Sequence, residues 1–160
     1  MHETPHSDPV YKITIIPRGQ SGGFTMALPE QDSILMFRNQ IMARITGLMG
    51  GRVAEEIFCN DITSGASNDL QVATQLVEDM VMRLGMSIGG LRVFQRHEAG
   101  SSQAGQKTFE TLDNAINEIL DACYREAKRI VTEKQDTVER VTQALLSQET
   151  LSREEFLALI

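Results

Sequence analysis

The sequence predicts a mainly α-helical domain that carries a small two-stranded β element near its N-terminus. After residue 32, apolar side chains recur every three to four positions over most of the chain, which is the spacing of one face of an α-helix. Before that point, two short segments suited to strands are each followed by a proline. With 160 residues, the chain is long enough to form one domain with its own apolar core.

The β element is predicted to consist of residues 11–16 and 24–28. The first segment contains a run of β-branched residues and ends before Pro17, and the second ends before Pro29. A glycine-rich loop, 18–23, separates them. Two strands of this length form a small edge element rather than a full sheet.

The rest of the chain is predicted to form helices, the first of which is expected to end at Gly50 and Gly51 and to resume as a shorter helix over 52–58. Each predicted helix has one apolar face. These faces consist of Ile34, Phe37, Ile41, Ile45 and Leu48; then Leu70, Ala73, Val77, Met80, Val81 and Leu84; then Phe109, Leu112, Ile116, Ile119, Cys123, Ala127, Ile130 and Val131; and finally Val138, Val141 and Leu145.

Helix starts can also be read from the sequence. Ser67 is suited to the N-cap of the helix that follows it. Ser152 and Glu155 have the spacing of a capping box, which predicts a terminal helix that ends at Ile160.

Composition excludes some classes of function. The net charge is −7 and no basic stripe is present, which argues against a nucleic-acid partner. No apolar run is long enough to span a bilayer. Cys59 and Cys123 are not paired in spacing and lie among apolar residues, so both are predicted to be buried thiols.

Two stretches contain letters of the zinc-protease signature H-E-x-x-H. Residues 2–6 read His-Glu-Thr-Pro-His, and residues 97–101 read His-Glu-Ala-Gly-Ser, without the second histidine. On a helix, histidines four positions apart project to the same side and can reach one metal ion, while the glutamate activates the metal-bound water. The stretch 97–101 lies in a glycine-rich segment and is interpreted as an exposed loop that has these letters by coincidence.

The stretch 2–6 has two interpretations. Either His2 and His6 form a zinc site on one helical turn, or the letters are present without their helix. A single turn is shorter than the length at which helices are stable in water, and Pro9 follows closely. Pro5 is compatible with a helix start, because a proline in the first turn removes no intrahelical hydrogen bond.

Six blocks occur in the order "DPVYKITIIPRG", "GFTMALPEQD", "GGRVAEEI", "TSGASNDLQVAT", "GMS" and "ETLSREEF". In this order they resemble the peptidase domain of FtsH-type membrane AAA proteases, and the resemblance covers nearly everything from Ser7 to Ile160. It implies a mainly helical, zinc-dependent metalloendopeptidase domain that degrades unfolded or membrane polypeptides delivered by an AAA ATPase ring.

The resemblance also implies roles for particular residues. His2, His6 and Asp69 would be the zinc ligands, and Glu3 would be the general base. Glu55 would be a carboxylate that supports the metal site from behind the ligands. Phe24, Thr25 and Met26 would belong to the edge strand along which substrate lies, since a strand edge can pair with extended polypeptide through main-chain hydrogen bonds.

The family pattern is incomplete in this sequence. Only Ser7 separates His6 from the "DPV" block, where the family has further helical turns, and no Walker-type motif is present, so this chain is not expected to bind ATP. Residues 1–160 are expected to be a peptidase domain that lacks most of the zinc-motif helix, the ATPase module and the membrane anchor.

Partners and location follow from the same resemblance. A homo-oligomeric ring is expected, with the full-length family at the cytoplasmic side of a membrane and this chain itself soluble. The alternative function is a metal-free, inactive helical assembly domain that keeps only the oligomerisation surface. Metal content would discriminate between the two functions.

Overall fold

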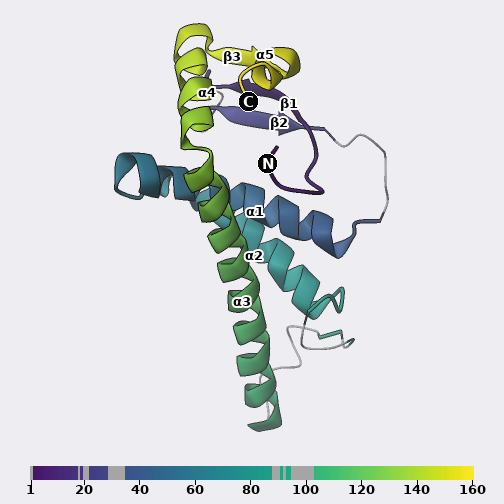
Figure 1. Cartoon of the computed structure of the whole chain (residues 1–160). Coiled ribbons are helices and arrows are strands. Elements are labelled where there is room, and N and C mark those ends of the chain that lie inside the picture. Colours follow the sequence, from purple (N-terminus) through teal and green to yellow (C-terminus); the bar gives the residue numbers. More distant parts are fainter. Residues whose placement is uncertain are drawn as a thin grey trace.

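The structure is a computed structural model that describes residues 2–17, 19, 22–28, 35–87, 91, 93–94 and 103–160. Its elements, in chain order, are β1 (Val10–Thr14), β2 (Phe24–Ala27), α1 (Arg38–Ala54), a π-helical turn (Glu55–Cys59), a 3-10 turn (Ser64–Ala66), α2 (Ser67–Met82), α3 (Gln103–Glu133), α4 (Gln135–Gln148), β3 (Thr150–Ser152) and α5 (Arg153–Leu157). The predicted mainly helical class is confirmed (Figure 1). The stretch 97–101 lies outside the described residues.

The main core lies where α3 packs against α1 and α2, as Figure 1 shows. Most of the apolar positions that periodicity predicts on these helices are buried. Leu84, predicted on the face of the second helix, lies after α2 and is 50% exposed, and Ile34 lies outside the described residues. The buried cluster consists of Ile41, Ile45, Met49 and Val53 from α1; Ala73, Val77, Met80 and Val81 from α2; and Leu112, Ala115, Ile119, Cys123 and Ala127 from α3. Burial of these side chains is the principal favourable term that holds the helices together.

The sheet has three antiparallel strands in the order β2-β1-β3, so the two predicted strands are joined by a third from the C-terminal end of the chain. Ile13 lies opposite Leu151, and Thr14 lies opposite Thr150. The Thr14 hydroxyl donates to the Glu149 carbonyl over 3.0 Å. The strand β3 is only three residues long and lies between two helices, so no alternation of apolar residues marks it in the sequence.

The prediction that Gly50 and Gly51 interrupt the first helix is wrong, because α1 continues through both to Ala54 and then into the π-helical turn. Glycine in a helix interior costs about 1 kcal/mol relative to alanine. Here Met49 and Val53, on either side of the pair, are both buried in the core. Their burial offsets the local cost.

Helix boundaries also differ from the predictions at several points. Phe37, predicted to lie on a buried face, precedes the first helical residue and is 75% exposed. Ser67 is already helical, and the residue before it, Ala66, caps the helix without a side-chain hydrogen bond. Of the two cysteines, Cys123 is buried as predicted, whereas Cys59 is exposed.

The predicted capping box at Ser152 is present. The Ser152 amide donates to Glu155 Oε2 over 2.8 Å, and the Glu155 amide donates to Ser152 Oγ over 3.3 Å. The helix that it opens ends at Leu157, earlier than predicted.

The core assignment leads to a prediction about stability. Ile45 is fully buried between the helices, so Ile45→Ala should remove about 2–5 kcal/mol from the free energy of unfolding. Leu146→Ala, at an exposed position of α4, is the matched control and should change it by less than about 0.5 kcal/mol. Urea unfolding monitored by circular dichroism measures both. Equal losses would contradict the core assignment.

Candidate functional site

The predicted zinc-motif residues at the N-terminus lie in turns rather than in a helix. His6 has φ of 68°, which is in the left-handed region and cannot continue a right-handed helical turn. The Ser7 amide donates to the Thr4 carbonyl over 3.2 Å, which closes a turn. His2 and His6 therefore do not share a helix face in this arrangement.

The same segment contacts distant parts of the fold. The His2 ring meets the Phe156 ring of α5 edge to face, with centroids 5.7 Å apart and planes at 83°. Glu3 forms an ion pair with Lys134 over 3.4 Å. Thr4 is only 8% exposed. The residue predicted as general base thus has a lysine as its neighbour.

Asp69 lies in the first turn of α2 and is half-buried. Burial raises the pKa of its carboxyl above the ordinary aspartate range, because the charged form loses hydration. The position itself favours a negative charge through the helix dipole, so an aspartate here also has a purely structural explanation.

The residues present do not form a zinc site in this arrangement. Across the parts of the chain that are described, no three histidine, cysteine, aspartate or glutamate side chains lie close enough together to hold a metal ion. His2, His6 and Asp69 are all described residues, so they are not assembled as a ligand set. Their assignment as ligands, with Glu3 as base, stays a prediction.

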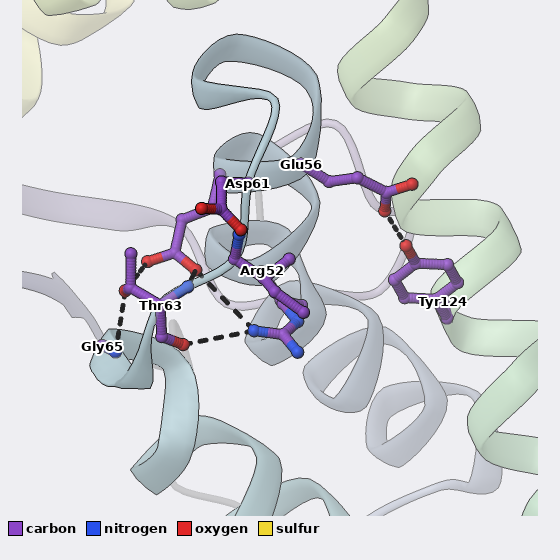
Figure 2. Close-up of polar contacts among 8 residues, drawn as sticks. Arg52, Glu56, Asp61, Thr63, Gly65 and Tyr124 are labelled. Carbon is purple, nitrogen blue, oxygen red and sulfur yellow. Dashed lines mark hydrogen bonds and ion pairs between the residues drawn. The ribbon is translucent and has the colours of Figure 1, made fainter.

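Glu55 is the centre of a polar network at the end of α1, which we name the Glu55 latch (Arg52, Glu55, Thr63 and Gly65). Figure 2 labels Arg52, Thr63 and Gly65 of this network. Glu55 accepts hydrogen bonds from the Thr63 amide over 3.1 Å and from the Thr63 hydroxyl over 2.5 Å. Arg52 Nη1 lies 3.9 Å from Glu55 and donates to the Thr63 carbonyl over 3.2 Å. The hydrogen bonds from Thr63 lower the pKa of Glu55, since they stabilise its charged form.

The Glu55 latch holds the loop that leads into α2. The Gly65 amide donates to Thr63 Oγ1 over 3.0 Å. A Cβ atom at Gly65 would lie 3.1 Å from Thr63 Oγ1 and 3.2 Å from Glu55 Oε1, so a side chain would crowd both. Asp69 follows in the first turn of the helix that starts there. Sequence reasoning placed Glu55 near the metal ligands and missed Thr63 and Gly65, although both belong to the quoted "TSGASNDLQVAT" block.

Glu56, the neighbour of Glu55, contacts a different element. The Tyr124 hydroxyl of α3 donates to Glu56 Oε2 (Figure 2), and Lys128 Nζ donates to Glu56 Oε1 over 2.7 Å. The hydrogen bonds from Lys128 and Tyr124 lower the pKa of Glu56, and the bond to Glu56 raises the pKa of Tyr124. A groove borders this contact, lined by Arg52, Glu56, Asn60, Asp61, Ile62 and Tyr124.

The predicted substrate strand is at an edge of the sheet. Phe24, Thr25 and Met26 belong to β2, which pairs with β1 and is the outermost strand on that side among the residues that the structure describes. Thr25 and Met26 are exposed, and Phe24 is half-buried. An edge strand presents main-chain N–H and C=O groups that can pair with another extended chain.

Together these features define a mainly helical domain with an exposed edge strand and a carboxylate latch at the start of α2. The sequence model of Peptidase family M41 matches residues 2–159, and the chain belongs to this family.

Similar proteins bear the name of ATP-dependent zinc metalloprotease FtsH. FtsH 1 of Thermoanaerobacter sp. (strain X514) is 38% identical over 95% of this chain and 26% of that protein. FtsH of Bacillus subtilis (strain 168) is 39% identical over 96% of this chain and 26% of that protein. FtsH of Slackia heliotrinireducens is 37% identical over 99% of this chain and 22% of that protein.

The chain spans about a quarter of the length of the curated relatives it matches. The resemblance to FtsH-type proteases is confirmed. Among the helices in the described ranges, none has both the length and the apolar character needed to cross a bilayer.

The Glu55 latch leads to a prediction about pH. The pKa of Glu55 is lower in the folded chain, so its stabilising contribution is present above the ordinary glutamate pKa of about 4.3 and is lost as the pH falls through the lowered value. Glu55→Gln should therefore lower the melting temperature at pH 7, and the difference from the unaltered chain should shrink towards pH 3. Glu110→Gln, at an exposed position of α3, is the control. A difference that is independent of pH would contradict this prediction.

Proposed function

We propose that this chain is the peptidase domain of an FtsH-type zinc metalloendopeptidase that degrades unfolded or membrane polypeptides delivered by an AAA ATPase module of the same family. Membership of Peptidase family M41 supports this proposal, as do the names of the relatives, which are ATP-dependent zinc metalloproteases. The observation that carries it is the family match over residues 2–159. Asp69, half-buried at the start of α2, and the Glu55–Thr63 hydrogen bond before that helix are compatible with it.

Residues 1–160 would form this domain, and the ATPase module and membrane anchor would belong to other parts of the protein. The whole protein would act at the cytoplasmic side of a membrane and would assemble as a ring of identical subunits. Exposed apolar side chains beside the start of α1 are consistent with contacts between copies, since Leu35 is 77% and Phe37 is 75% exposed.

Within the domain, the residues of the proposed site lie in two separate regions. The Glu55 latch and the start of α2 belong to the packed body, whereas His2, Glu3 and His6 lie in turns that contact α5 and Lys134. We therefore expect this chain to carry the fold of the peptidase domain without an assembled metal centre. We derive no hydrolytic step through zinc from this arrangement.

In the proposed function, the β2 edge would bind the substrate polypeptide. Main-chain hydrogen bonds to an extended polypeptide are independent of the side chains of the bound chain. Such pairing suits a protease that accepts many unfolded sequences. Phe24, Thr25 and Met26 would form the pairing edge.

The second candidate function is a metal-free helical assembly domain. The observation in its favour is that, in the described parts of the chain, no set of three metal-binding side chains is brought together. An assembly domain would have no use for substrate pairing at β2, so binding of unfolded polypeptide discriminates between the two functions.

The first test measures zinc and hydrolysis. We expect the purified chain, dialysed against zinc and then against buffer, to retain well under one zinc per chain and to leave a labelled unfolded protein uncleaved, because a catalytic metal site requires preorganised ligands. Asp69→Ala should give the same result. One zinc per chain that is lost in His2→Ala, His6→Ala and Asp69→Ala, with cleavage lost in Glu3→Gln, would show that the centre does assemble.

The second test measures substrate pairing without metal. Neighbouring amides of a strand point to opposite sides, so either Thr25 or Met26 directs its N–H away from β1. Proline at the outward position should abolish binding of a fluorescent unfolded polypeptide and preserve the fold, because proline removes the donor. Thr25→Pro and Met26→Pro are compared by fluorescence anisotropy and circular dichroism. Absence of binding by the unaltered chain would favour the assembly domain, and unchanged binding in every folded variant would show that the polypeptide does not pair with the β2 edge.

A further inference from the structure

Residues 2–9 run along the boundary between the two apolar groups of the fold, and we name them the N-terminal strap. One group is the core of α1, α2 and α3. The other is formed where α4 and α5 pack against the sheet, with Leu151 and Phe156 buried. Figure 1 shows the sheet, α4 and α5 at one end of the molecule, the three core helices at the other, and the N-terminus between them.

The connection between the two groups changes direction at Lys134. This residue separates α3 from α4 and has φ of −114° and ψ of 25°, which is not helical. A break of this kind in a long helix leaves the relative position of its two halves dependent on other contacts. The N-terminal strap supplies contacts at this place, because Glu3 pairs with Lys134.

The strap also contacts the elements beyond the break. The His2 ring packs edge to face on Phe156 of α5, in the geometry that aromatic rings prefer. Thr4 is buried, and its carbonyl accepts the turn hydrogen bond from Ser7. At the other end of the strap, the Pro9 carbonyl accepts from the Leu28 amide, just after β2.

We propose that the N-terminal strap fastens α5 and the sheet to the junction between α3 and α4 at Lys134, and that His2 acts in it as a packing residue. The strap geometry excludes the H-E-x-x-H mode of zinc coordination by His2 and His6. That mode places both histidines on one helical turn, whereas the strap holds His6 in the left-handed region and His2 against Phe156. Residues 2–6 thus hold two parts of the fold together instead of binding a metal ion.

The two histidines provide the test, since a ligand pair and a packing contact make opposite predictions about them. Loss of either ligand should abolish zinc binding equally. In the strap both histidines are exposed to solvent, and among the described ring contacts His2, not His6, packs on an aromatic ring. The proposal concerns the chain without metal or substrate, so it can fail while the proposed function stands, and the reverse also holds.

The experiment compares the melting temperatures of His2→Ala, His2→Phe and His6→Ala in EDTA and in equimolar zinc. His2→Ala should melt about 2–4 °C lower, as expected for loss of an aromatic pair in a chain of this size. His2→Phe, which restores a ring that cannot bind zinc, should recover most of that loss. His6→Ala should melt within about 1 °C of the unaltered chain, and zinc should change none of the values.

Three outcomes would overturn the proposal. One is an unchanged melting temperature in His2→Ala. Another is a His2→Phe variant that melts as low as His2→Ala. The third is stabilisation by zinc that is lost equally in His2→Ala and His6→Ala.

Discussion

The packing of α3 against α1 and α2 is the contact on which the rest of the structure depends. Small buried residues, Cys123 and Ala127, lie on the face of α3 at this contact, and the Cys123 thiol donates to the Met42 carbonyl of α1 over 3.7 Å. From α3 the chain continues through Lys134 and α4 to β3, which pairs with β1. The Thr14 and Thr150 hydroxyls, 136 positions apart, are joined by a 2.8 Å hydrogen bond. Contacts on both sides of the α3–α4 break therefore position the sheet, which lies outside the helical core.

Periodicity predicted the core well, because a helix with one apolar face can satisfy it only by burying that face. It failed where tertiary contacts outweigh local preference. Gly50 and Gly51 have poor helix propensity, yet the helix passes through them because core residues lie on both sides. It also failed for β3, whose three residues become a strand only because β1 is beside them. Cys59 is exposed because it ends a π-helical turn that no simple sequence period marks.

For the candidate site, the sequence predicts which residues would take part but not how they are arranged in space. The H-E-x-x-H pattern identified His2, Glu3 and His6 as a possible metal motif, and the resemblance to a family added Asp69. Whether the ligands meet depends on backbone conformation, and the left-handed φ of His6 cannot be predicted from the motif. Glu55 was placed near the site through the resemblance to a family. Its bond to Thr63 depends on the turn between α1 and α2, so spacing in the sequence does not specify it.

Glu55 and Glu56 are adjacent in the π-helical turn that follows α1, yet they contact two different elements. Glu55 accepts from Thr63 in the loop before α2, whereas Glu56 accepts from Tyr124 of α3. These contacts hold the start of α2, and Asp69 with it, in a fixed position relative to the helical core. The N-terminal strap instead takes its position from α5 and from the α3–α4 break. A metal centre that joined Asp69 to His2 and His6 would have to combine two independently held parts, so its formation would have to compete with the contacts that now hold the strap.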